Sequence, residues 1–220
     1  MKKAHKLIAA AFAVTLAGCT AITPIEKQYS GFLGDYAGLK EVDTADGSKA
    51  LRWVSPSIQK GFYKKVVIPP VTFFPAPRTG EQVKSDTLNE ISAYMTKRLR
   101  EEVGKNFVVT TVPGPDTFNL QVAITGVSTP REGLRFYEVL PITLAFASAT
   151  TLAGQRDHVT VVYLETLATD SKSGDELLKG VRQGIGEKLE NDKQQLELEQ
   201  MKKVIDNWAI EGGKLAAGLL

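Results

Sequence analysis

The sequence has little of the two residue types that most often build redox and transition-metal sites. Cysteine occurs once, at Cys19, and histidine twice, at His5 and His158. One cysteine allows no disulfide within the chain, and a zinc-type site needs several nitrogen or sulfur ligands. We therefore expect no disulfide framework, no metal site and no bound cofactor.

The chain also lacks the patterns of common catalytic sites. It contains no Gly-x-Ser-x-Gly nucleophile motif. His158 follows Asp157, but neighbouring residues in a strand point to opposite faces, so Asp157 would not orient the imidazole. Glu165 interrupts an otherwise apolar stretch, and is either a functional carboxylate or a residue on the solvent face of a half-exposed sheet. We predict no catalytic residues, and a hydrolase that uses His158 or a carboxylate is the alternative.

Clustered positive charge is scarce as well. The formal charge of +2 includes Lys2, Lys3 and Lys6, and without these three lysines the balance becomes −1. No strong basic run follows them in the sequence. Binding to nucleic acid needs a clustered basic surface, so we expect no nucleic-acid partner.

A secretory signal is the first feature that the chain does contain. Three lysines precede an uncharged run from Leu7 to Leu16, and small residues follow. A basic start, an apolar run and a small-residue site are typical of a signal peptide. The apolar run has about half of the ~20 residues that a membrane span requires. Residues 1–18 are therefore predicted to be a signal peptide rather than a transmembrane helix.

The signal ends in Leu16-Ala17-Gly18-Cys19, which resembles the lipobox of bacterial lipoproteins. The resemblance implies cleavage between Gly18 and Cys19 and acylation of Cys19. One acyl chain binds a membrane reversibly, whereas two or three chains on one cysteine give a lasting anchor. Thr20 stands where aspartate favours inner-membrane retention in Gram-negative sorting. We expect an outer-membrane lipoprotein that faces the periplasm and contacts the membrane through acyl chains on Cys19.

The rest of the chain divides into a tether and one domain. Residues 19–30 are predicted to be a lipidated tether, which reaches only ~35 Å when fully extended. Residues 31–220 are predicted to form a single domain, because about 200 residues suffice for one sizeable core. Residues 31–40 carry several apolar side chains and are expected to pack onto this domain as an arm.

Hydrophobic periodicity predicts the order of the elements in the domain. Apolar residues at spacings of three and four predict helices over about 85–105 and 191–210. β-Branched runs and alternating patterns predict strands over 63–74, 106–112, 118–127, 157–170 and 176–185. With a helix over 139–155, the order is β-α-β-β-α-β-β-α. We expect an α+β fold with a mixed, mainly antiparallel sheet and helices packed on it.

Turn and loop signals separate these elements. The pair Pro69-Pro70 is expected to end the strand over 63–74 or to confine it to an edge. Residues 42–50 are expected to form an exposed loop, and Gly212-Gly213 to end the last helix. The last two strands are expected to form a hairpin whose turn uses Gly174 at positive φ.

The stretch over residues 139–155 carries no charge and allows two interpretations. As a helix it would be about 26 Å long, which falls short of a membrane span. It is either a helix buried against the sheet or a surface that meets a partner or the membrane interface.

Several segments together resemble one family. With the lipobox, these are YSGFLGDY, LRWVSP, YKKVVIPPV, VPGPDTFNLQVAITGV and ETLATDSKSGDEL. They are similar to a family of bacterial lipoproteins known as domain of unknown function 3313, which has no assigned activity to transfer. We expect a non-enzymatic, lipid-anchored envelope protein that binds another envelope component. A carrier of lipids or small molecules is a further alternative, and it predicts an apolar cavity between the uncharged helix and the sheet.

Overall fold

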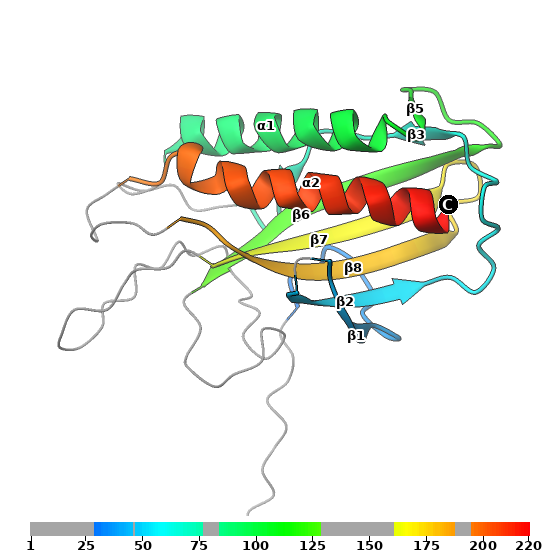
Figure 1. Cartoon of the computed structure of the whole chain (residues 1–220), viewed down its shortest axis with the longest axis horizontal. Coiled ribbons are helices and arrows are strands. Elements are labelled where there is room, and N and C mark those ends of the chain that lie inside the picture. Colours follow the sequence, from blue (N-terminus) through cyan, green and yellow to red (C-terminus); the bar gives the residue numbers. More distant parts are fainter. Residues whose placement is uncertain (1–28, 46, 77–83, 129–160, 188–194) are drawn as a thin grey trace, which may run out of the picture.

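The computed structural model describes residues 29–45, 47–76, 84–128, 161–187 and 195–220. They form a single mixed α+β domain in which an open, mainly antiparallel sheet carries two helices (Figure 1). The signal peptide, including Gly18, lies outside the described residues, as do Cys19, His158 and the stretch over 139–155.

The sheet has eight strands within the described part of the chain. They are β1 (Lys40–Asp43), β2 (Lys49–Val54), β3 (Lys65–Val67), β4 (Thr72–Phe73), β5 (Val108–Val109), β6 (Thr117–Ser128), β7 (Val161–Asp170) and β8 (Glu176–Ile185). The helices are α1 (Ser85–Val103) and α2 (Glu199–Leu219). The strand order is β1-β2-β8-β7-β6-β3-β5, and β4 also pairs with β6. In this order, the four neighbouring pairs β1–β2, β2–β8, β8–β7 and β7–β6 are antiparallel. The pairs β3–β6, β3–β5 and β4–β6 are parallel.

The strongest local sequence patterns coincide with elements of the structure. Helix α1 and the β7–β8 hairpin are found in their predicted ranges, and Gly174 in the hairpin turn has a φ of 78°. The loop expected over 42–50 is found only between Asp43 and Lys49, because its two ends belong to β1 and β2, which pair as a hairpin. β1 is charged at three of its four positions and lies at the sheet edge, so no alternating apolar pattern marks it. The described elements thus include strands before α1 that the predicted order lacks.

Two consecutive prolines split the strand predicted over 63–74 into β3 and β4, as expected. Side chains of α1 bind backbone groups at this break. Arg100 Nη2 donates to the carbonyl oxygen of Ile68 at 2.7 Å, and the N–H of Val71 donates to Thr96 Oγ1 at 2.8 Å. Helix α1 therefore satisfies polar groups that the interrupted strand leaves unpaired.

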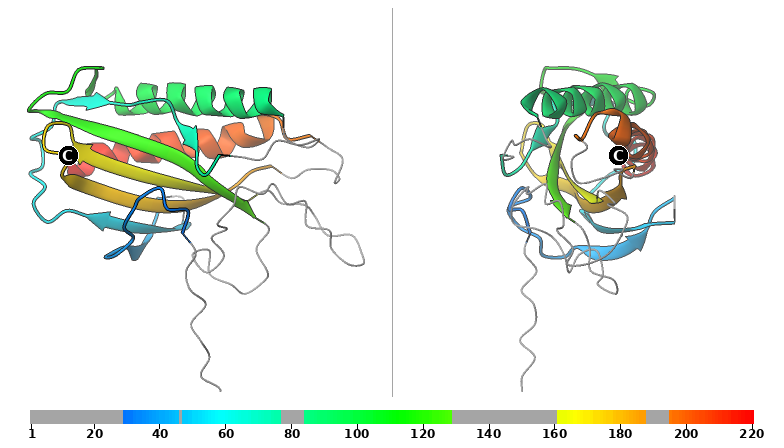
Figure 2. Two further views of the ribbon diagram at one scale, coloured as in Figure 1. Left: turned by 180° about the vertical axis from the view of Figure 1, so that it is seen from behind. Right: turned by 90° about the vertical axis from the view of Figure 1, so that its left-hand side faces the viewer.

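The main core lies between the helices and one face of the sheet (Figure 2). Its most deeply buried side chains come from both layers, and they include Ile91, Met95, Phe118, Ile124 and Ile205. Burial of such apolar surface is the dominant stabilising term for a chain that has no disulfide.

The opposite face of the sheet is covered by the arm, defined here as residues 29–39. Its apolar side chains pack on a separate, smaller cluster that contains Leu51, Tyr163 and Val181. The expected packing of this segment onto the domain is therefore confirmed. The middle of the sheet is therefore buried on both faces: beneath the helices on one side and beneath the arm on the other.

Helix α2 does not end at Gly212 and Gly213, as the sequence predicted, but continues to Leu219. A Cβ on Gly213 would lie 2.9 Å from the carbonyl oxygen of Glu102 in α1. The two helices thus approach each other so closely that only glycine fits at this position. The close approach accounts for a residue of weak helix propensity in the middle of a helix.

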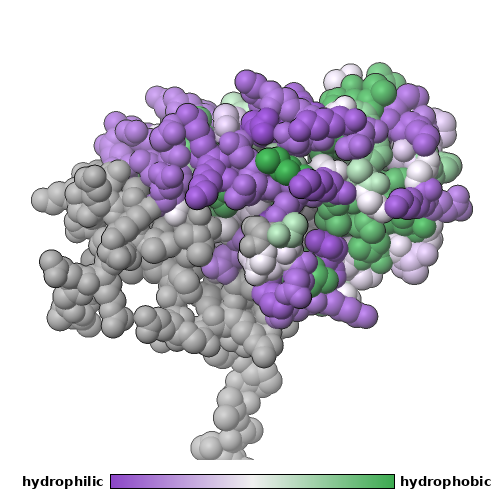
Figure 3. Space-filling model, in the orientation of Figure 1, coloured by the Kyte–Doolittle hydropathy of each residue, from purple (hydrophilic) through white to green (hydrophobic). Residues whose placement is uncertain are grey.

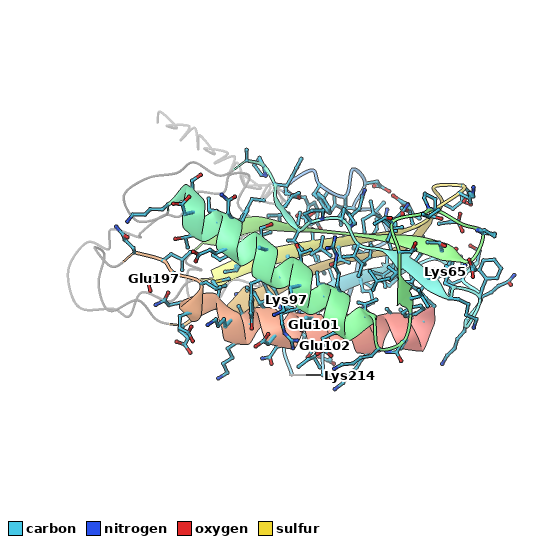
Figure 4. The ribbon with its side chains drawn as sticks, turned by 90° about the horizontal axis from the view of Figure 1, so that it is seen from above. Lys65, Lys97, Glu101, Glu102, Glu197 and Lys214 are labelled. Atoms are coloured by element: carbon cyan, nitrogen blue, oxygen red, sulfur yellow. The ribbon has the colours of Figure 1, made fainter. Side chains whose placement is uncertain are left out.

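A charged network joins the outer sides of the two helices. Arg98 of α1 lies 2.7 Å from Asp206 of α2 and 3.2 Å from Glu102, and it also contacts Glu101. Figure 4 shows Glu101 and Glu102 on α1 beside α2. The hydrogen bonds to Asp206 and then Glu101 raise the pKa of Arg98 above its ordinary value. The network therefore keeps a charged guanidinium between the two helices.

Apolar side chains are exposed at the end of the sheet where β3 and β5 lie (Figure 3). Phe62, Val108 and Val112 expose 48%, 63% and 67% of their surface, and we call them the β5 patch. The other edge strand, β1, is mostly charged. Charged residues protect a sheet edge from association, so the two edges of this sheet differ in how readily they would pair with another protein.

Candidate functional site

A cavity of about 110 Å³ lies between α2 and the sheet. Its walls are mostly apolar and include Leu164, Leu178 and Trp208. An engineered apolar cavity of about 150 Å³ binds one benzene molecule. The space beneath α2 is therefore on the scale of a single ring or a short alkyl chain.

Two glycines on opposite walls keep this space open. Gly180 lies in β8, and a Cβ there would have no neighbour closer than 3.8 Å. Gly212 lies in α2, and its Cβ would be 3.8 Å from Leu99 Cδ2. A side chain at either position would enter the cavity without a steric clash. The cavity thus depends on the absence of two side chains.

Three charged residues line the same cavity: Arg52 of β2, Arg182 of β8 and Glu211 of α2. Arg182 and Glu211 form an ion pair whose side chains are only 13% and 16% exposed. The Arg52 side chain forms no hydrogen bond or ion pair with the described residues. The lining therefore carries one positive charge more than its ion pair neutralises.

Burial lowers the pKa of Arg52 from its ordinary value, and the positive charge of Arg182 acts in the same direction, while Glu211 opposes it. An arginine nevertheless stays protonated in proteins. The remaining polar side chains of the lining are those of Thr44 and Thr166, and it contains no histidine, cysteine or serine. The cavity thus has the chemistry of a binding site for an apolar group next to an anion, rather than that of a nucleophile with its base.

On the opposite face of the sheet, the arm covers Glu165 of β7, whose side chain is fully buried. Its interpretation as a solvent-facing residue is therefore wrong. The sequence of β7 alone suggests a sheet with one exposed face, but the arm covers that face. The hydroxyl of Tyr36 donates a hydrogen bond to Glu165 Oε2 at 2.6 Å. Glu165 Oε1 has no hydrogen-bond partner within the part of the chain that the structure describes.

The arm itself holds Tyr36 in place. Backbone N–H groups of Gly31 and Leu33 donate to its hydroxyl oxygen at 3.0 and 3.3 Å. The ring of Tyr29 stacks on the ring of Tyr36, with 4.0 Å between the ring centres. Burial raises the pKa of Tyr36 to about 12, and the hydrogen bond to Glu165 adds to this rise. Tyr36 thus carries a polar connection from the arm to the middle of the sheet.

A buried lysine forms a second connection between the arm and the sheet. Lys179 of β8 is only 2% exposed. Its Nζ lies 2.9 Å from Glu176, 3.6 Å from Asp35 in the arm and 5.1 Å from the ring centre of Trp53. The lysine is therefore compensated by two carboxylates and an aromatic face. Like Glu165, it serves to dock the arm.

Sequence reasoning missed the cavity residues. It predicted the strand that contains Gly180 and Arg182, but periodicity in that strand does not show which residues face a void. The usable signal was the presence of two glycines and an arginine within one strand, because glycine in a strand interior often marks a close approach or a binding site. The expected cavity beside the stretch 139–155 falls outside the described residues, and the observed one lies beneath α2 instead.

The structure adds two findings on metals and membranes. In the ranges that it describes, no three His, Cys, Asp or Glu side chains are grouped so as to hold a metal ion. Neither α1 nor α2 is long and apolar enough to span a bilayer. The described part of the chain is thus an α+β domain with an arm on one face and a small cavity under the helices on the other.

The sequence of this domain places it in a family. Residues 28–211 match the family described as "Protein of unknown function (DUF3313)", and the chain belongs to this family. It is 36% identical over 198 residues to the "Uncharacterized lipoprotein YdcL" of Escherichia coli (strain K12), which covers 90% of this chain and 89% of that protein. The family resemblance that the sequence motifs indicated is therefore confirmed. The similarity to a lipoprotein suggests the cell envelope as the compartment.

Solved structures show a more limited likeness. The dodecamer of a single-substitution PelC variant from Paraburkholderia phytofirmans is 13% identical, with a TM-score of 0.39 over 77% of this chain and 99% of that chain. The hypothetical protein CT253 from Chlamydia trachomatis is 11% identical, with a TM-score of 0.37 over 71% of this chain and 91% of that chain. Neither the family description nor the name of the E. coli lipoprotein indicates an enzymatic activity.

Proposed function

We propose that this protein is a lipid-anchored, non-enzymatic binding protein of the cell envelope. The observation that carries the proposal is the cavity beneath α2, which combines an apolar lining with Arg52 and contains no nucleophile–base pair. Such a site is suited to hold a ligand rather than to transform it. The similarity to a lipoprotein supports the anchor.

The anchor is assigned to acyl chains on Cys19, at the periplasmic face of the outer membrane. The lipobox over residues 16–19 and Thr20 support this assignment. The docked arm supports it further, because the arm begins at Tyr29 and the chain between Cys19 and Tyr29 spans at most ~33 Å. A domain tied in this way would stay close to its membrane.

Replacement of Cys19 by alanine tests the anchor. We expect the variant to keep its signal peptide, to incorporate no labelled palmitate and to disappear from the outer-membrane fraction of a sucrose gradient, because the thiol is the acyl acceptor. The matched control is Thr20→Asp, which should still incorporate palmitate but move to the inner-membrane fraction. Palmitate labelling of the Cys19→Ala variant would refute the anchor.

A protein of the envelope is the proposed partner of this domain. The β5 patch supports this part of the proposal, because its three apolar side chains are exposed beside a short edge strand. Large contiguous apolar surface is uncommon on soluble monomers, and unpaired strand edges favour association.

Site-specific photo-crosslinking in cells tests the partner. A photoreactive residue at position 108 or 112 should give an adduct with one defined envelope protein, whereas the same residue at position 40 on the charged edge should not. Val108→Lys should then abolish co-purification of that protein, since it places a charge in the contact. Adducts of equal yield from positions 40 and 108 would contradict the assignment of this surface.

A further inference from the structure

The size of the cavity limits what it can hold. Its volume of about 110 Å³ is well below the 300–1,000 Å³ typical of pockets for drug-sized ligands. A whole phospholipid or a nucleotide cofactor does not fit. A phenyl ring or a chain of a few carbon atoms is the largest group that such a space accepts.

The charge of the lining defines the second part of the ligand. Arg182 is paired with Glu211, and Arg52 forms no ion pair or hydrogen bond of its own with the described residues, although Glu211 acts on it at longer range. Arg52 lies directly opposite Gly180 in the β2–β8 register. Arg52 and the glycine that opens the cavity are therefore cross-strand neighbours. A planar guanidinium binds carboxylates through two parallel hydrogen bonds.

The two glycines indicate that the space is more than a chance void. Glycine in a strand or helix interior lowers stability, and an unfilled cavity lowers it further. An alanine or a larger apolar residue at position 180 or 212 would remove both costs, because neither position meets a close neighbour. The sequence thus retains space next to an unpaired cation at the expense of stability.

From these three observations we infer that the cavity between α2 and the sheet is a binding site for a small carboxylic acid. The apolar part of the acid, an aromatic ring or a short alkyl chain, occupies the space between Gly180 and Gly212. The carboxylate binds Arg52. This inference rests on the proposed binding function and specifies the ligand class of the same site.

Fluorine NMR titration of the full chain, isolated from the envelope and held in lipid nanodiscs, tests the inference. The probe is para-fluorophenylacetate, and empty nanodiscs provide the correction for partition into lipid. The amide and the amine with the same fluorinated ring serve as neutral and cationic comparisons. We expect saturable binding of the acid, with affinity at least about tenfold higher than for the amide, because the amide forms no charge-assisted hydrogen bond. The amine should not bind.

Variants separate the two parts of the site. Arg52→Gln should weaken binding of the acid about tenfold and leave that of the amide unchanged. The series Gly180→Ala, Gly180→Val and Gly180→Leu should weaken both probes in proportion to side-chain volume. The graded series keeps the test valid even if the largest substitution prevents folding. Lys97→Gln, on the outer side of α1, is the matched charge control and should leave affinity unchanged.

Any of three results would overturn the inference: equal affinity for the acid and the amide, unchanged affinity across the Gly180 series, or absence of saturable binding. The anchor is tested separately, because membrane fractionation of Cys19→Ala does not depend on the cavity, and the titration is run without nanodiscs if the chain proves not to be acylated. A protein that binds the acid but is not acylated, or the reverse, would show which of the two proposals fails.

Discussion

Replacement of Gly184 by alanine is expected to destabilise the protein by about 2–3 kcal/mol, although it adds one methyl group. Gly184 lies in β8 beneath α2, and a Cβ at this position would overlap Val204 and lie 2.9 Å from Trp208 Cε2. Both side chains are at least nine-tenths buried, so the overlap is relieved only if they shift from their packed positions. The added methyl group must therefore displace the Val204 and Trp208 side chains, or α2 with them.

Urea unfolding of the full chain, followed by tryptophan fluorescence, measures this loss as a lower transition midpoint. Gly180→Ala is the matched control, since it lies four residues earlier on the same face of the same strand. Its Cβ would have no neighbour closer than 3.8 Å, and we expect its stability to stay within about 0.5 kcal/mol of the wild type or to rise slightly. Equal losses in the two variants would mean that strand propensity, and not the contact with Trp208, decides the outcome.

This pair of glycines shows which parts of the fold a sequence pattern can predict. Helix α1 and the β7–β8 hairpin follow from periodicity within a single segment, and both are found where the pattern placed them. The roles of Gly180 and Gly184 depend on what α2 places above each of them. That relation joins segments far apart in the chain, so it has no local signal. The same reason explains why Gly212 and Gly213 predicted a helix end and instead lie within α2.

The candidate sites divide in the same way. Cys19 was identified from sequence because a processing enzyme reads a short linear motif. Arg52 was not identified, because it becomes distinctive only when β2 pairs with β8 and brings it opposite Gly180. Glu165 drew attention as a carboxylate among apolar residues, but its burial follows from the arm, whose Tyr36 is 129 positions away in the sequence.

Tyr36→Phe is expected to destabilise the protein by about 2 kcal/mol, because the carboxyl group of Glu165 then stays buried without its one described hydrogen-bond donor. Urea unfolding measures the change. Tyr29→Phe is the matched control, since it keeps the stacked ring and leaves the bond between Tyr36 and Glu165 intact. The double variant Tyr36→Phe/Glu165→Met should recover part of the loss, because it removes the buried carboxyl group, although the N–H groups of Gly31 and Leu33 still lose the hydroxyl that accepted from them. A double variant as unstable as the sum of the two single ones would contradict this coupling.

Alkaline pH tests the same contact without a change of packing. The pKa of Tyr36 is about 12 in the folded protein against an ordinary value of 10.0, and burial followed by the bond to Glu165 causes the rise. A group whose pKa is raised by folding contributes stability that is fully present below its unfolded pKa and is lost as the pH rises towards its folded pKa. Stability should therefore fall between about pH 10 and pH 12 in the wild type. Tyr36→Phe should lose less over this range and retain the part due to other groups whose pKa is raised by folding. Among these are Tyr63, whose pKa is raised to about 12 by burial and then by its bond to Asp170, and Tyr29 and Tyr94, whose pKa values burial also raises. An equal alkaline loss in both proteins would show that ionisation of Tyr36 is not linked to docking of the arm.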